Sequence, residues 1–162
     1  MATETPSSTL VITPDALLKH WQGHRALSRR VIEAFPEQEL YQHTIGGMRP
    51  FSTLAMEMVR MAVPTLNGIV TGDWAFASES GDPPTKAEIL RQWDETTAEI
   101  DRLWPQIPPA RFQEVDTAFG QWKMAIHDLI LYIVDNEIHH RGQGYVYLRS
   151  LGIEPPPFWE RG

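Results

Sequence analysis

The last third of the chain contains the pattern that most restricts its fold. From about Lys123 to Leu151 there is no proline, and apolar side chains recur at the three- and four-residue spacing of a helix. Gly152 and the prolines at 155–157 follow as helix-stop signals. One face is expected to carry Leu129, Ile133, Asn136, His140, Gly144 and Tyr147. The rest of the chain must therefore supply helices against which this face can pack.

Clear boundary signals predict two of those partner helices. Thr13 is an N-cap residue followed by a proline and an acidic first turn, and the apolar positions that begin there continue until Pro36 ends the helix. Thr85 and Glu88 form a capping box at the start of another helix, which is predicted to end before Pro105. Both segments are long enough to pack along the last helix.

A further helix is predicted to begin after Pro50 and to continue through Leu66. Pro64 lies inside this segment, and proline removes one backbone donor and crowds the preceding turn, so we expect a bend or break near residues 61–63. Residues 71–84 are predicted to form a loop whose Trp74 and Phe76 fold back on the helices.

Four long helical segments and no long strand predict an all-α fold, a four-helix bundle. Residues 1–162 are expected to form a single domain, in which residues 1–12 are a surface arm. Residues 111–122 mix partial alternation with a glycine, so a short hairpin or an irregular crossover is expected there. Phe158 and Trp159 are expected to hold the C-terminal tail against the domain.

Composition excludes several classes of function. The net charge of −7 argues against a general nucleic-acid-binding protein, because such binding depends on Lys and Arg that neutralise phosphates. The absence of cysteine excludes disulfides, thiolate metal sites and a cysteine nucleophile. No apolar run is long enough to span a membrane and no signal peptide begins the chain, so a soluble cytoplasmic protein is expected.

Polar residues on the apolar faces are the candidates for function. Asn136 and His140 interrupt the stripe of the last helix at i, i+4 spacing, and Glu57 projects from the edge of the apolar face of the 51–66 helix. An imidazole nitrogen, a carboxylate and an amide oxygen from two helices could bind a metal ion. Hydrogen bonding within the core, or a position of Glu57 at the solvent boundary, would explain the same pattern.

Other polar residues of these helices have structural interpretations. His139 should point about 100° away from His140 and so outside the candidate site. Glu137 and Arg141 have the spacing of a helix-surface ion pair, or of a clamp that orients a ligand residue. His24 lies on the apolar face of the first helix and is interpreted as a hydrogen-bonded core histidine.

The end of the chain resembles the C-terminal motif of the DinB/YfiT-like metalloenzyme superfamily, the DNA-damage-inducible DinB family. The similar residues are His-His-Arg-Gly-Gln at 139–143, Tyr-Val-Tyr-Leu-Arg at 145–149 and Gly-Ile-Glu-Pro-Pro-Pro at 152–157. Less specific similarities are Trp21 with His24-Arg25, and Met48-Arg49-Pro50. The resemblance implies a four-helix bundle with an additional short helix, often a homodimer, with a role in stress or DNA-damage responses.

The resemblance also implies a divalent metal, commonly nickel or zinc, bound by three histidines. Transferred to this chain, the final histidine matches His140, its i−4 partner matches Asn136, and the second-helix ligand matches Glu57. Two of the three ligand positions depart from the family pattern. We therefore expect a variant site that binds zinc, nickel or manganese weakly, or a vestigial site without metal in which Glu57 and His140 form a hydrogen bond.

Two functions follow as hypotheses. The first is a transferase or hydrolase-like activity on an unknown small molecule, with a low-molecular-weight thiol as cosubstrate, because the resemblance implies thiol-dependent relatives. The second is a non-catalytic, metal-free helical homodimer that acts as a binding or scaffold module, in which His139, His140 and the tyrosines at 145 and 147 are core or interface residues.

Overall fold

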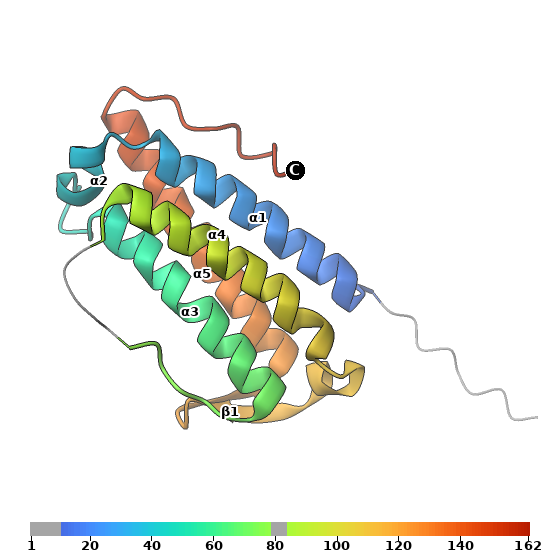
Figure 1. Cartoon of the computed structure of the whole chain (residues 1–162). Coiled ribbons are helices and arrows are strands. Elements are labelled where there is room, and N and C mark those ends of the chain that lie inside the picture. Colours follow the sequence, from blue (N-terminus) through green and yellow to red (C-terminus); the bar gives the residue numbers. More distant parts are fainter. Residues whose placement is uncertain (1–10, 79–83) are drawn as a thin grey trace, which may run out of the picture.

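The computed structural model describes residues 11–78 and 84–162 (Figure 1). Four long helices lie side by side: α1 (Pro14–Ala34), α3 (Phe51–Thr71), α4 (Lys86–Leu103) and α5 (Ile126–Ser150). Helix α1 packs against α4 and α5, and α3 packs against the same two helices. The predicted arm at residues 1–12 lies almost entirely outside the described residues. None of the described helices combines the length and the apolar character that crossing a membrane requires.

Shorter elements connect these helices. An additional short helix, α2 (Glu37–Gln42), follows α1. Between α4 and α5 come two 3-10 helices and a two-stranded antiparallel hairpin, in the order η1 (Trp104–Gln106), η2 (Pro109–Gln113), β1 (Val115–Ala118) and β2 (Trp122–Ala125). The fold is therefore mainly helical rather than strictly all-α.

The helix starts agree with the capping signals in the sequence. The Thr13 side-chain oxygen accepts a hydrogen bond from the Ala16 N–H at 3.1 Å, and the Thr85 oxygen accepts one from the Glu88 N–H at 3.2 Å. Each bond satisfies a backbone donor that has no partner within its helix. Gly152 follows α5 with φ of 75°, a backbone conformation that glycine adopts without steric penalty.

Two expectations about helix continuity differ from the structure, for different reasons. Helix α3 continues through Pro64 without a break, although an interior proline costs about 3 kcal/mol. Ala62 and Leu66 on either side of it are fully buried, so packing of both turns offsets that cost. Helix α5 begins at Ile126 rather than near Lys123, because residues 122–125 pair with the preceding strand.

The hairpin resolves the ambiguity of residues 111–122. Ala118 pairs with Trp122 and Val115 pairs with Ala125, which leaves a three-residue turn. Gly120 has φ of 68°, and Phe119 has φ of 53°, a left-handed conformation that bulky residues rarely adopt. Such a residue typically costs about 1 kcal/mol or more and persists only where its surroundings hold it in place.

The buried apolar side chains form two clusters along the helices. One contains Trp21, Leu66 and Ile130, and the other contains Phe35, Phe51 and Tyr147. Buried polar residues of α1 and α5 lie between them in sequence: His24, Arg25, Ser28, Glu137, His140 and Arg141. The core therefore contains a layer of polar residues from α1 and α5.

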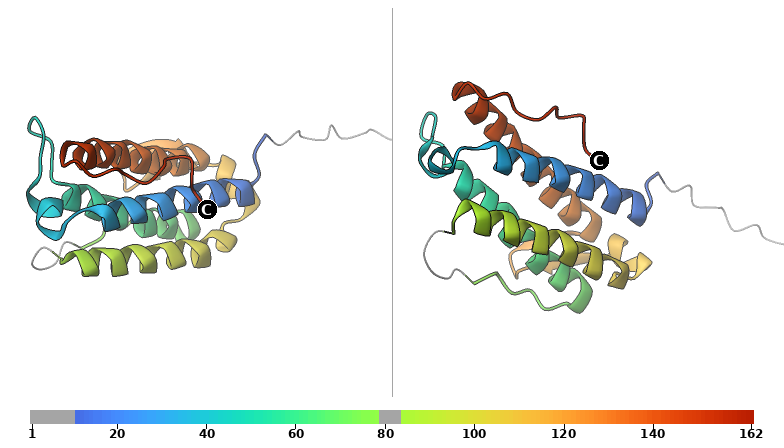
Figure 2. Two further views of the ribbon diagram at one scale, coloured as in Figure 1. Left: turned by 90° about the horizontal axis from the view of Figure 1, so that it is seen from above. Right: turned by 45° about the horizontal axis from the view of Figure 1, so that its top comes forward.

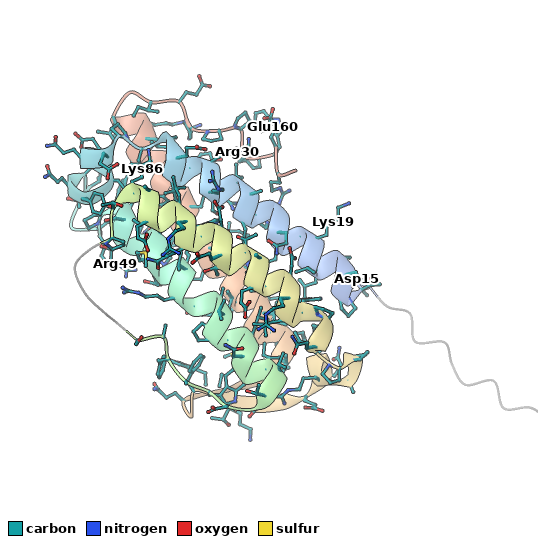
Figure 3. The ribbon with its side chains drawn as sticks, in the orientation of Figure 1. Asp15, Lys19, Arg30, Arg49, Lys86 and Glu160 are labelled. Carbon is teal, nitrogen blue, oxygen red and sulfur yellow. The ribbon has the colours of Figure 1, made fainter. Side chains whose placement is uncertain are left out.

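The C-terminal tail returns along α1 (Figure 2), but the predicted anchors do not hold it there. Phe158 and Trp159 are 64% and 67% exposed. Instead, the Tyr145 hydroxyl donates to the Pro156 carbonyl oxygen at 2.6 Å, and Arg30 donates to the Glu160 carbonyl oxygen (Figure 3). Polar contacts to backbone carbonyls hold the tail, and these contacts leave no signal in an apolar pattern.

Candidate functional site

The three residues singled out from the sequence meet where α3 and α5 pack together. The His140 Nε2 atom lies 2.9 Å from Glu57 Oε1. The Asn136 Nδ2 atom lies 3.5 Å from the same oxygen and 3.2 Å from the Met61 Sδ atom. The i, i+4 spacing of Asn136 and His140 places both on the α3-facing side of α5, as predicted.

Glu57 is partly exposed, with 30% of its side-chain area accessible. Its second oxygen, Oε2, accepts a hydrogen bond from Arg49 Nη1 at 2.6 Å. Burial raises the pKa of Glu57, but the hydrogen bonds from His140 and Arg49 lower the pKa, and the net value is below the usual range. Glu57 is therefore a stable carboxylate that accepts from an imidazole and a guanidinium.

His140 is more deeply placed, with 7% of its side chain exposed. Its second ring nitrogen, Nδ1, lies 3.1 Å from Gln143 Oε1, and the Gln143 amide nitrogen lies 3.7 Å from Met48 Sδ. Both ring nitrogens therefore face oxygen atoms, an arrangement in which a protonated imidazole donates twice.

Two members of this site, Arg49 and Gln143, were not predicted as site residues. Both belong to short motifs noted in the sequence, Met48-Arg49-Pro50 and His-His-Arg-Gly-Gln. Gln143 is three residues after His140 and so lies on the same helix face, which is a signal that could have identified it. Arg49 precedes α3 and approaches Glu57 only through the fold.

His139 lies outside the site, as its rotation around the helix predicts. It is exposed, and its ring centroid is 5.2 Å from that of His140. Because the two rings touch without sharing a partner, His139 provides a matched control for experiments on His140.

Glu137 and Arg141 do not form the predicted helix-surface pair, because both are buried against α1. Glu137 is 2% exposed and accepts from the Ser28 hydroxyl at 2.8 Å, while its Oε2 atom lies 3.6 Å from Arg25 Nη1. Arg141 Nη1 donates to the His24 carbonyl oxygen at 3.1 Å and to Ser28 Oγ at 3.2 Å. We call these five residues of α1 and α5 the buried polar network.

Within this buried polar network, one carboxylate, that of Glu137, faces the two guanidinium groups of Arg25 and Arg141. Burial raises the pKa of Glu137 and lowers the pKa of Arg25 and Arg141, while the opposite charges counteract those shifts. The guanidinium of Arg25 also lies 4.1 Å from the centroid of the Trp93 ring and donates through Nε to Thr97 Oγ1 at 2.8 Å. These contacts orient α1, α4 and α5 relative to one another.

His24 is a hydrogen-bonded core histidine, as predicted. It is 4% exposed, and its Nδ1 atom accepts from Arg141 Nη2 at 2.9 Å. Burial and the positive charge of Arg141, with contributions from His20 and Arg161, lower the pKa of His24 to about 4. The ring is therefore neutral at pH 7.

A cavity of about 400 Å³ adjoins the candidate site along the same pair of helices. Met61 separates the two, since it lines the cavity and also contacts the Asn136 amide. Tyr132 and Ile133, one turn before Asn136, line the cavity from α5, and Phe119 and Trp122 line it from the hairpin. The polar site and the apolar cavity therefore share a wall.

Comparison with known proteins identifies the family. The model of the DinB family matches residues 6–161, which is nearly the whole chain. The chain belongs to the DinB family. The uncharacterized protein YrdA of Bacillus subtilis (strain 168) is 24% identical to the chain over 150 residues, which cover 89% of this chain and 86% of YrdA.

Solved structures show the same fold for this DinB-family chain. A DinB-like protein of Bacillus subtilis, YjoA, superposes with a TM-score of 0.73 at 17% identity, covering 90% of this chain and 99% of YjoA. A DinB-like protein of Bacillus cereus ATCC 10987 gives a TM-score of 0.71 at 17% identity and covers 88% of this chain and 95% of that protein. Identities this low support the fold alone.

The donor set fits the metal implied by the DinB resemblance poorly. Only His140 offers a nitrogen ligand, and Asn136 presents its amide nitrogen, a hydrogen-bond donor, toward Glu57. Arg49 already neutralises Glu57, and its positive charge would repel a divalent cation. Within residues 11–78 and 84–162, no three His, Cys, Asp or Glu side chains gather as a metal-binding group. The arrangement instead suits a carboxylate surrounded by donors.

Proposed function

We propose that this DinB-family chain is a metal-independent enzyme in which His140 accepts a proton from a small-molecule nucleophile. The fold is proposed to be the four-helix bundle of the family, with α2 as its additional short helix. One observation carries the proposal: the direct 2.9 Å contact of His140 Nε2 with Glu57 Oε1, in a carboxylate site that Arg49 already neutralises.

The geometry supports proton uptake by His140 rather than by Glu57. Hydrogen bonds from His140 and Arg49 hold the Glu57 pKa low, so that carboxylate resists protonation. An imidazolium at position 140 would donate to Glu57 Oε1 and to Gln143 Oε1, which are the two oxygens nearest its ring nitrogens. Glu57 and Gln143 are positioning residues that stabilise the protonated ring.

A low-molecular-weight thiol is the nucleophile that this proposal favours, in keeping with the thiol-dependent relatives implied by the resemblance. The chain has no cysteine of its own, so the thiol would be a cosubstrate. His140 would take the S–H proton at Nδ1, where the thiol would replace the Gln143 contact, and the guanidinium of Arg49 near the site would favour the thiolate that remains.

The test follows the reaction of glutathione with 1-chloro-2,4-dinitrobenzene, in which the S–H proton is lost, an S–C bond forms and chloride leaves. We expect chelator-treated protein to accelerate this reaction, and His140→Ala to reduce the acceleration by about 100-fold or more. His139→Ala, the exposed neighbour, should retain the wild-type rate. Equal losses in both variants, or no acceleration by wild type, would exclude the proposed role of His140.

Metal loading separates this proposal from a variant metal site at Glu57, Asn136 and His140. Zinc, nickel or manganese added to chelator-treated protein should leave the melting temperature unchanged, because an ion that binds the native state would raise it. Metal analysis should find no stoichiometric ion. Occupancy near one ion per chain that is lost in Glu57→Ala would establish the metal site instead.

The alternative function, a non-catalytic homodimer, is favoured by one specific feature. Phe158 and Trp159 on the tail and Val146 on α5 are all more than half exposed, and exposed apolar surface often marks an interface. Sedimentation velocity at increasing concentration tests this alternative: Trp159→Ala should shift a dimer toward monomer if the tail forms the contact.

A further inference from the structure

We infer that the cavity beside the Glu57–His140 site binds the aromatic ring of a small molecule, which is the apolar part of the substrate of that site. The inference deepens the proposed function. Only the statement that the bound molecule is a substrate rests on that function. The binding of an aromatic ring stands on separate observations. These are the composition of the cavity walls, the strained turn that supplies one wall, and the wall shared with the polar site.

Aromatic side chains from separate segments form the outer part of the cavity. Phe119 and Trp122 come from the hairpin, Phe76 from the segment after α3, and Tyr132 from α5. The Phe76 and Phe119 rings stack with centroids 4.5 Å apart, and Phe119 and Trp122 meet edge to face at 6.1 Å. Aromatic rings favour stacked and edge-to-face neighbours, so these walls complement another flat ring.

These rings remain exposed although apolar surface is normally buried. Phe76 is 62% exposed, Tyr132 56% and Trp122 47%. In the interior of the cavity, by contrast, Leu129 and Ile133 of α5 are each only 5% exposed. An open aromatic rim above a closed aliphatic floor is typical of a small-molecule site, and a volume near 400 Å³ lies within the usual range of such sites.

Phe119 adds an independent observation. A turn residue with φ of 53° would ordinarily be glycine or asparagine, yet here a phenylalanine occupies it. Its ring packs against Trp74, with centroids 5.4 Å apart, as well as against Phe76. Trp74 in turn fills the space above Gly68, where a Cβ atom would lie 2.0 Å from the indole. The fold thus holds a residue with a strained backbone conformation at the cavity wall, and such strain clusters at ligand sites.

The cavity is connected to the chemistry through Met61 and Asn136. Met61 Sδ lies 3.2 Å from the Asn136 amide nitrogen, and that nitrogen lies 3.5 Å from Glu57 Oε1. A ring in the cavity would therefore contact Met61, and these contacts lead from Met61 through Asn136 to Glu57 of the Glu57–His140 pair. A polar substituent on that ring could face the pair while the ring itself stays among apolar atoms.

Methionine methyl NMR on the full chain tests the inference with 2-naphthol as the probe. The chain contains six methionines, two of which, Met61 and Met124, line the cavity, while Met58 is buried in the other apolar cluster. We expect the Met61 and Met124 signals of ¹³C-methyl-labelled protein to shift on titration, and the Met58 signal to stay. If neither cavity signal moves at saturating probe, the inference is wrong.

Two exposed tryptophans provide a matched pair of variants. Trp122→Ala removes a cavity wall and should weaken 2-naphthol binding about tenfold in calorimetry, whereas Trp159→Ala, on the tail, should leave binding unchanged. If both variants weaken 2-naphthol binding equally, the assignment of the cavity as the binding site is wrong. A Trp122→Ala change that alters sedimentation, together with a silent titration, would show that the aromatic rim is an interface between copies.

The result is independent of the proton-transfer proposal. His140→Ala should still bind 2-naphthol, because His140 does not line the cavity. Binding without any thiol reaction in wild type would therefore contradict the proposed function and leave the cavity assignment intact. Thiol reaction in wild type without shifts at Met61 and Met124 would support the proposed function and contradict the cavity assignment.

Discussion

Two sides of helix α5 carry polar residues that are neighbours in sequence but differ in their surroundings. On the side facing α1, Glu137 and Arg141 are buried at 2% and 5% exposure, and their polar atoms contact α1. On the side facing α3, His140 bonds to a carboxylate that is 30% exposed and lies next to a cavity. The first arrangement fixes helices relative to one another, and the second leaves charge accessible to a ligand.

The largest difference between the two sides should be in stability. Glu137→Ala leaves Arg25 and Arg141 buried without their carboxylate, and we expect a loss of about 3–5 kcal/mol in the free energy of unfolding. Glu57→Ala removes a partly exposed carboxylate and should cost about 1 kcal/mol or less. Urea unfolding of both variants makes the comparison. Similar losses would show that the α3-facing pair is also structural.

Stability should also depend on pH through the α1-facing side. The pKa of His24 falls from 6.5 to about 4 on folding, so the unfolded chain binds the proton more readily. The stabilisation is therefore fully present above pH 6.5 and is lost as the pH falls toward 4, by up to about 3 kcal/mol. Urea unfolding between pH 7 and pH 4 should show this loss, and His24→Asn should reduce it. A wild-type profile that does not change between pH 6.5 and pH 4 would contradict the assignment.

Two glycines on different sides of α5 test the comparison with an effect of intermediate size on stability. A Cβ at Gly144 would lie 2.6 Å from the Phe51 ring on α3, whereas Gly142 is exposed and has nothing within 4 Å. We expect Gly144→Ala to destabilise the protein by about 1–3 kcal/mol through overpacking, and Gly142→Ala to stabilise it by about 0.5–1 kcal/mol through helix propensity. Thermal unfolding distinguishes the two signs. Destabilisation in both would indicate contacts at Gly142.

The smallest expected effect concerns Arg49. Arg49→Gln should reduce stability by less than about 1 kcal/mol, because the Arg49 and Glu57 side chains are 49% and 30% exposed. The pKa of Glu57 should rise toward its usual value, since one of the two donors that lower it is gone. A depressed carboxylate pKa stabilises the protein above the unfolded value near 4.5, and that stabilisation disappears as the pH falls below it. Carboxyl ¹³C NMR would follow the titration, and an unchanged Glu57 pKa would rule out a contribution from Arg49.

Local sequence signals predicted the elements well and their surroundings poorly. Caps at Thr13 and Thr85 and the stop at Gly152 depend on neighbouring residues, so they could be predicted correctly. Pro64 was expected to bend or break its helix, but the helix continues through it, because packing of both flanking turns outweighs that local cost. Phe158 and Trp159 were expected to hold the C-terminal tail against the domain, yet hydrogen bonds to backbone carbonyls hold it.

The candidate site shows the same division. Periodicity placed Asn136 and His140 on one face, excluded His139 and put Glu57 at the edge of the facing helix, and the family resemblance pointed to the same three residues. The role of Arg49 could not be predicted, because it depends on how the segment before α3 approaches that helix. The burial of Glu137 and Arg141 was missed, because i, i+4 spacing is the same on exposed and buried faces.

The long helices, most of their ends and the family of the chain follow from local patterns of residues. Which polar face of α5 is enclosed by α1, and which stays open toward α3 and the hairpin, depends on how the helices pack in three dimensions. The physical reason is that helical periodicity fixes the angle between side chains on one helix, whereas burial and charge pairing depend on the helices that surround it.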